Sequence, residues 1–244
     1  SGKVEVLDIL GYEPSVGAGS LIGISAKSLI SNVYSAADVV LKSPNKDRYT
    51  LSFAGGLIAS ATSYGQDAIP SRLENAYFTG SVLSEASNVA IGGIVGVNFA
   101  GHVIKNSYTS SNVTITCLGA CNVSGATAYA GGVAGSNSGT INNAYTTGQT
   151  TLNISSLFSN GQRVASATAG GVVGENAGTI SNTYAAKRVL DNGTGNFAGD
   201  IFASVPPSFS PTVTSSHAPT AASLTNQAFY TGFDFANTWV MGAN

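Results

Sequence analysis

Acidic side chains are the first residues to test for chemistry, because sugar-cleaving enzymes work with carboxyl groups. Glycoside hydrolysis needs two of them about 5–9.5 Å apart, and a lyase needs a base beside cations in a groove. The acids here fall at non-equivalent positions of a repeating pattern, and no second acid shares the position of Glu175. The sequence therefore predicts no catalytic pair and no enzyme activity. The acids near the repeating segments are Asp38, Glu74, Glu85, Glu175 and Asp191.

Histidines and cysteines are too few and too scattered for a zinc site, which needs four such ligands. His102 and His217 each stand alone, and we expect His102 to face solvent in a turn. The cysteines are Cys117 and Cys121, with a glycine between them. This spacing permits a small-loop disulfide, which we favour over two free thiols. The sequence predicts no metal and no cofactor.

Other polar groups carry weaker signals. Lys187, Arg188 and Asp191 lie close together after the last repeating unit, and we interpret them as a surface ion-pair cluster. Asn-x-Ser/Thr sequons arise by chance in a chain rich in these residues, so glycosylation is a minor hypothesis. The four sequons begin at Asn112, Asn122, Asn153 and Asn192.

Composition narrows the function classes. Charged residues make up 9% of the 244 residues, against roughly 25% in an average soluble domain. The net charge is −2 and no basic stripe occurs, which argues against nucleic acid as a partner. No apolar run approaches the roughly 20 residues of a membrane-spanning helix, so we expect no membrane insertion. The chain opens Ser1-Gly2-Lys3-Val4, which suggests either a segment of a longer protein or a processed N-terminus.

An internal repeat is the strongest signal. A glycine-flanked apolar block, clearest as Gly92-Gly93-Ile94-Val95-Gly96, begins at positions 19, 55, 92, 131 and 170. Each block is followed by a segment of the form Ile-x-Asn-x-Tyr and then by a third stretch such as 112–116. Three short strands broken by turns cannot bury an apolar face alone, so units of this kind must stack. We predict an all-β, right-handed parallel β-helix of about five three-stranded coils with loop excursions.

Stacking places equivalent side chains above one another. We predict an amide ladder and an aromatic column, since stacked strands allow both. Alternation along the strand puts each tyrosine on the same face as the buried isoleucine, which favours tyrosines in or beside the core over a sugar-stacking platform. The ladder residues are Asn32, Asn75, Asn106, Asn143 and Asn182, and the column residues are Tyr34, Tyr77, Tyr108, Tyr145 and Tyr184.

The pattern Gly-Gly-x-Val-Gly-x-Asn-x-Gly-x-Ile-x-Asn-x-Tyr resembles the GLUG repeat of bacterial secreted and surface proteins. Residues 131–145 and 170–184 fit it closely, whereas the copy from Gly92 departs in its turn at 99–103. Residues 229–239 resemble the segment that commonly closes such arrays. The resemblance covers roughly 18–190 and 224–240. It implies a parallel β-helix within large adhesins, filamentous-haemagglutinin-like exoproteins or cell-wall peptidases, in which the repeat is not catalytic.

Four regions follow from this pattern. Residues 1–17 are expected to form an N-terminal cap or a preceding coil, and 18–190 the GLUG-like solenoid. Residues 191–223 lose the repeat and gain prolines, which predicts a long extended loop. Residues 224–244 are expected to cap the last coil and cover its open edge.

The leading expectation is a binding segment of a bacterial surface or secreted adhesin. Loops that project at the same coil position often form a solenoid's binding face, so loops beside the coils would contact a host-cell or matrix glycan or protein. Flanking coils of a full-length protein would be further partners. The alternatives are a structural stalk that displays another domain and, less favoured, a polysaccharide lyase or hydrolase. Ice binding is discounted because the position after each Tyr block forms no regular threonine ladder.

Overall fold

The computed structural model describes most of the repeating region and short parts of the C-terminal region. The described residues are 2–7, 15–42, 51–62, 71–86, 88–117, 126–154, 158–159, 162–163, 165–187, 189–191, 197–199, 202–204, 212–214, 227–229 and 233–236.

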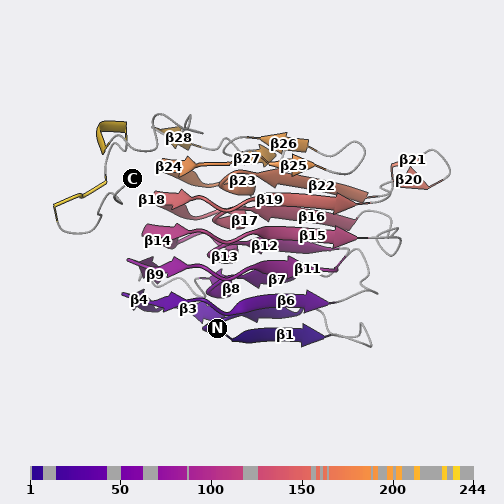
Figure 1. Cartoon of the computed structure of the whole chain (residues 1–244), viewed down its shortest axis with the longest axis horizontal. Coiled ribbons are helices and arrows are strands. Elements are labelled where there is room, and N and C mark those ends of the chain that lie inside the picture. Colours follow the sequence, from indigo (N-terminus) through magenta and orange to yellow (C-terminus); the bar gives the residue numbers. More distant parts are fainter. Residues whose placement is uncertain are drawn as a thin grey trace.

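Strands far apart in sequence pair in parallel and build four sheets, which confirms the predicted parallel β-solenoid (Figure 1). The first sheet contains β1 (Lys3–Leu7), β6 (Asp38–Lys42), β11 (Val82–Ser84), β15 (Val113–Cys117), β19 (Thr150–Ile154) and β25 (Leu190–Asp191). The second contains β2 (Gly17–Gly19), β7 (Ser52–Gly55), β12 (Val89–Gly92), β16 (Ala126–Gly131), β22 (Ala165–Gly170) and β26 (Phe197–Gly199). The third contains β3 (Ile22–Ala26), β8 (Ile58–Thr62), β13 (Val95–Asn98), β17 (Ala134–Asn137), β23 (Val173–Asn176) and β27 (Phe202–Ser204). The fourth contains β4 (Leu29–Ser31), β5 (Tyr34–Ser35), β9 (Ser71–Glu74), β10 (Tyr77–Phe78), β14 (His102–Thr109), β18 (Thr140–Thr146), β24 (Thr179–Ala185) and β28 (Thr212–Thr214).

Each coil contributes strands to four sheets, whereas the sequence predicted three strands per coil. The difference arises at the paired glycines, which form a turn between a strand of the second sheet and one of the third. Gly93 lies in such a turn between β12 and β13, and a Cβ there would collide with the carbonyl oxygen of Gly132 in the next coil. The close approach of successive turns therefore demands glycine at this position.

The solenoid extends beyond the repeat at both ends. Strand β1 pairs with β6, so residues 3–7 belong to the first coil. The expectation of one extended loop over 191–223 is wrong for its described residues, because β26, β27 and β28 pair with β22, β23 and β24. This last coil lacks the Gly-Gly and Asn-x-Tyr markers, but Val213 is in register with Ile180 of the coil before it. Strands can pair without the Gly-Gly and Asn-x-Tyr residues, because these residues form the turns and bends between strands.

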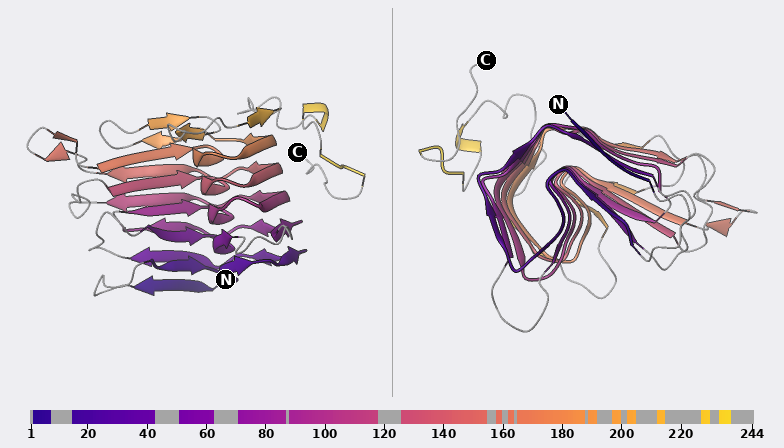
Figure 2. Two further views of the ribbon diagram at one scale, coloured as in Figure 1. Left: turned by 180° about the vertical axis from the view of Figure 1, so that it is seen from behind. Right: turned by 90° about the horizontal axis from the view of Figure 1, so that it is seen from below.

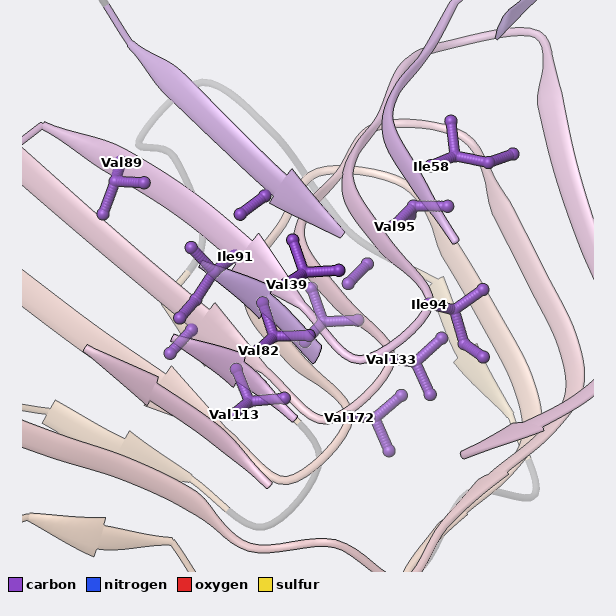
Figure 3. Packing of buried hydrophobic residues seen from close by; sticks show 14 of the residues in the cluster. Val39, Ile58, Val82, Val89, Ile91, Ile94, Val95, Val113, Val133 and Val172 are labelled. Atoms are coloured by element: carbon purple, nitrogen blue, oxygen red, sulfur yellow. The ribbon is translucent and has the colours of Figure 1, made fainter. Parts of the chain in front are cut away.

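Viewed along the stack, the sheets form two arms that meet at an angle (Figure 2). The first and second sheets make one arm, and the third and fourth make the other. Aliphatic columns fill each arm: Val39, Val82 and Val113 are in register across three coils and lie opposite Val89 and Ile91 (Figure 3). All five side chains are fully buried. No single coil encloses this core, which is why the coils must stack.

Asparagines in left-handed backbone conformation bend the fourth sheet. Asn32, Asn75, Asn106, Asn143 and Asn182 have φ between 49° and 55°, a region that asparagine tolerates better than other non-glycine residues. This bend inserts an extra outward residue, so Ile104 and Ser107 are buried whereas Tyr108 lies outside them. The expectation that the tyrosines share the isoleucine face is wrong, because simple alternation stops at the asparagine.

Substitutions of Asn143 test whether the bend requires the left-handed backbone conformation. Glycine at this position keeps the positive φ but removes two ladder hydrogen bonds, and we expect it to cost about 1 kcal/mol of unfolding free energy. Valine also forces a β-branched side chain into the left-handed region, and we expect about 1–2 kcal/mol more. Urea unfolding of Asn143→Gly and Asn143→Val measures the two costs. Equal costs would show that the left-handed conformation is not required.

Two described pieces lie outside the coils. β20 (Phe158–Ser159) and β21 (Gln162–Arg163) form an antiparallel hairpin that projects from the tip of one arm (Figure 1). A 3-10 turn, η1 (Gln227–Phe229), and residues 233–236 lie beside the fourth sheet near its last strands. The described C-terminal residues thus flank the coils.

Candidate functional site

The outer face of the fourth sheet presents the two predicted columns. The five asparagines form a continuous chain of side-chain hydrogen bonds, in which each Nδ2 donates to the Oδ1 of the coil before it. The donor–acceptor distances are 3.3 Å for Asn75 to Asn32 and for Asn106 to Asn75, and 3.1 Å for Asn143 to Asn106 and for Asn182 to Asn143. Each amide keeps a second N–H that the ladder does not use.

The tyrosines stack beside this ladder. The ring centroids are 4.3 Å apart between Tyr34 and Tyr77 and 5.3 Å apart between Tyr77 and Tyr108, both pairs being stacked. Tyr108 and Tyr145 are 6.1 Å apart and tilted. Tyr34 is 50% exposed and Tyr77 36%. Because the stacked rings cover one another's faces, the column offers ring edges and hydroxyl groups to a ligand, and a sugar cannot stack flat on each ring in turn.

The last tyrosine of the column is enclosed. Tyr184 is fully buried, and the ring of Phe233 meets it edge-on at 5.5 Å between centroids. Phe233 in turn stacks against Phe235 at 6.3 Å. The described C-terminal residues therefore cover the side of the column at the fifth coil.

A second asparagine ladder, which sequence reasoning missed, lies inside the arm. Asn98 donates to Asn137 and Asn137 donates to Asn176, each at 2.7 Å, and all three residues are fully buried. Their recurrence 39 residues apart, at the ends of β13, β17 and β23, was a usable signal. Nδ2 of Asn176 completes the chain by donating to the carbonyl oxygen of Gly178.

His102 begins this interior chain, so the expectation that it faces solvent is wrong. The residue is fully buried, and its Nδ1 lies 2.6 Å from Oδ1 of Asn98. The Asn98 amide nitrogen donates to Asn137, so the atom of Asn98 that faces His102 is the amide oxygen, which can only accept a hydrogen bond. Nδ1 of His102 must therefore carry the proton. Nε2 is then an acceptor, and it is buried without a hydrogen-bond partner. Burial lowers the pKa of His102 to about 4.

Among the described residues, Glu175 belongs to a cluster with hydroxyl groups in which the pKa of one member, Tyr129, is strongly raised. Glu175 is a half-buried residue of β23 in the third sheet, and Tyr129 is a half-buried residue of β16 in the second sheet. Their side chains are hydrogen-bonded, and Oγ of Ser136 lies 3.5 Å from Oε2 of Glu175. Burial raises the pKa of Glu175, opposed by these two hydroxyl donors. Burial and the Glu175 charge raise the pKa of Tyr129 to about 12.

This cluster can accept a hydrogen bond from a ligand hydroxyl or amine, or hold one proton. The groups that shift the pKa of Glu175 include no second carboxylate, whereas glycoside hydrolysis needs two. Sequence reasoning placed Glu175 in the correct column, with Ser136, Val97, Ser60 and Ile24 below it. It could not pair Glu175 with Tyr129, because that hydrogen bond joins a third-sheet strand to a second-sheet strand and does not follow from membership of one column.

Glu175→Gln tests the cluster. The raised pKa means that the folded state holds the proton more tightly than the unfolded chain, so ionisation at neutral pH costs stability. We expect the variant to be more stable than the parent at pH 7, by less than about 1 kcal/mol because water screens this half-exposed carboxylate, and the gain to vanish in acid. Urea unfolding at pH 7 and pH 4 measures it. Glu85→Gln, at an exposed position, should shift stability by no more than about 0.5 kcal/mol at either pH. A loss of stability at pH 7 specific to Glu175→Gln would contradict the assignment.

The remaining predicted residues lie apart from these sites. Cys117 ends β15, and Cys121 lies outside the described residues, as do Asn122, Asn192 and Arg188. Asn112 is exposed, with its Oδ1 accepting a hydrogen bond from the backbone N–H of Gln149, and Asn153 is a half-buried residue of β19. Asp191 ends β25 and Lys187 follows β24 on the surface. The two described sequon asparagines are not neighbours in the sheet, because Asn112 lies beside Gln149 whereas Asn153 pairs with Thr116.

Two searches of the described residues give negative findings. They contain no group of three or more His, Cys, Asp or Glu side chains that could hold a metal ion. They also contain no helix long and apolar enough to cross a membrane.

Comparison with family models, with curated proteins and with solved structures returns no match for this chain.

Proposed function

We propose that the chain is a non-catalytic binding segment of a large bacterial surface or secreted adhesin, which contacts a host glycan or protein through loops beside its coils. The resemblance of its repeat to the GLUG pattern supports this assignment to extracellular proteins. The low content of charged residues, 9%, supports a surface that recognises its partner by hydrogen bonds and aromatic edges instead of by charge.

The observation that carries the proposal is the shared origin of three long connections, whereas a fourth of similar length, 63–70, joins β8 of the third sheet to β9 of the fourth. Residues 43–51 connect β6 to β7, 118–125 connect β15 to β16, and 155–164 connect β19 to β22. Each connection follows a first-sheet strand and precedes a second-sheet strand, so the strand ends that the three connections join lie at the tip of the same arm. The β20–β21 hairpin belongs to the last of them and projects from that tip (Figure 1). Variable loops gathered at one edge of a rigid scaffold are typical of binding proteins.

A structural stalk is the second candidate, and the continuity of the stack favours it. Core columns such as Leu57, Ile94, Val133 and Val172 pass through consecutive coils with every member fully buried. A solenoid with an unbroken core behaves as a rigid spacer. A polysaccharide lyase or hydrolase is a weaker candidate, because the described residues that hydrogen-bond Glu175 are the hydroxyl groups of Tyr129 and Ser136, and no carboxylate is among them.

Binding to a glycan array and adhesion to host cells distinguish the candidates. We expect the intact chain to bind, and a variant with 155–164 replaced by a short Gly-Ser turn to lose most of that binding while keeping its β-sheet circular dichroism. Tyr34→Phe, on the other arm, is the matched control and should bind like the parent. Absence of binding by the intact chain would favour the stalk, and cleavage of uronide polymers that Glu175→Gln abolishes would favour the enzyme.

A further inference from the structure

Several outer tyrosines are both exposed and in contact, a combination with chemical consequences. The rings of Tyr34 and Tyr77 are stacked with centroids 4.3 Å apart, and both side chains reach solvent. The two residues are paired across parallel strands β5 and β10, so the backbone holds them together. Two phenols kept in contact at a surface are poised to couple after one-electron oxidation.

We propose that the outer tyrosine column is an oxidative cross-linking site, where hydrogen peroxide and a haem peroxidase join Tyr34 to Tyr77 as dityrosine. This inference does not depend on the proposed binding function, because it uses only the fourth sheet and names its own oxidant.

The reaction balances without any group from the protein other than the two phenols. Each tyrosine loses one electron and its phenolic proton and becomes a phenoxyl radical, with spin density on the ring carbons beside the oxygen. Two such carbons form a carbon–carbon bond, and the hydrogen on each of them then moves as a proton to the phenolic oxygen of its own ring, so that both rings regain the phenol form without further loss. One hydrogen peroxide takes the two electrons and two protons and becomes two waters. The product is lighter than the parent by two hydrogen atoms.

Geometry selects this pair among the described tyrosines. The separation along the column grows from 4.3 Å to 5.3 Å and then 6.1 Å, so coupling is expected to weaken toward the later coils. Tyr184 is fully buried against Phe233 and out of reach of the oxidant. Tyr129 lies on another face, hydrogen-bonded to Glu175. Tyr34 and Tyr77 alone combine stacking, the shortest separation and the greatest exposure.

Tryptic mapping of the oxidised protein tests the proposal. Cleavage after lysine and arginine yields peptides 28–42 and 73–105, in which Tyr34 and Tyr77 are the sole tyrosines. After treatment with haem peroxidase and hydrogen peroxide, we expect these peptides to appear joined, with the mass of their sum minus two hydrogens and the fluorescence of dityrosine. Amide hydrogen exchange in β4 and β5 should slow in the cross-linked protein.

Two variants and one mixing experiment make the result decisive. Tyr34→Phe keeps the stacked ring but removes the phenol, so it should fold normally and lose the joined peptides entirely. Tyr129→Phe should leave their yield unchanged. When a mixture of isotope-labelled and unlabelled protein is oxidised, the two joined peptides should be either both labelled or both unlabelled, because the link forms within one molecule. Mixed peptides, no joined peptides, or links confined to other tyrosines would overturn the proposal.

Discussion

Replacing Asn137 by alanine is expected to lower the free energy of unfolding by roughly 3 kcal/mol, the largest effect that a single amide should have in this chain. Asn137 is fully buried and stands in the middle of the interior ladder. Its removal takes the acceptor from Nδ2 of Asn98, and the remaining acceptor for this nitrogen is the Thr140 carbonyl oxygen at 3.5 Å. A buried donor that loses its partner costs about 1–3 kcal/mol, and the space left by the side chain adds to this.

Urea unfolding followed by circular dichroism measures the loss. Ser110→Ala is the matched control, because Ser110 is an exposed residue of the neighbouring coil and should tolerate the change within about 0.5 kcal/mol. Equal stability of the two variants would show that the interior ladder is not the stabilising feature described above.

Acid is expected to destabilise the protein through His102. Between pH 6.5 and about 4 the unfolded chain binds a proton on this residue, whereas the buried neutral ring does not. The contribution of His102 to the free energy of unfolding is therefore fully present above pH 6.5. It decreases as the pH falls from 6.5 to about 4, because the unfolded state binds more protons in this range. A difference of about 2.5 pH units corresponds to a loss of up to about 3 kcal/mol. Protonation would also place a second donor, Nε2, where no acceptor lies.

His102→Gln isolates this contribution. Glutamine keeps an amide donor for Oδ1 of Asn98 but does not titrate. We expect the parent to lose more stability than the variant when unfolding is measured at pH 7 and at pH 4.5, and the difference between them to follow one protonation. Parallel pH dependence of the two proteins would mean that His102 does not stay neutral in the folded state.

The repeat made the solenoid predictable because its spacing is also the structural register. Block starts 36–39 residues apart correspond to paired residues such as Gly92 and Gly131, and Tyr108 and Tyr145. Column membership of the asparagines, the tyrosines and Glu175 therefore follows from counting. The last coil escaped notice because Phe197, Phe202 and Val213 keep only the alternating pattern that pairs with β22, β23 and β24.

Orientation and contacts between sheets were not predictable in the same way. The positive φ of Asn106 reverses which side chains face inward, so Tyr108 lies outside although Ile104 lies inside. The burial of His102 depends on a turn that brings it back to Asn98. The hydrogen bond between Tyr129 and Glu175 joins side chains of two different sheets. Each of these is set by backbone geometry that residue types alone do not encode.

The central claim is that residues about three dozen positions apart are stacked neighbours. Nuclear Overhauser effects between the ring protons of Tyr77 and Tyr108 test it most directly, with Tyr108→Phe used to assign the signals. The stack with ring centroids 5.3 Å apart predicts strong cross-peaks that move with the substitution. Absence of any contact between these rings in the folded protein would contradict the solenoid register and the sites built on it.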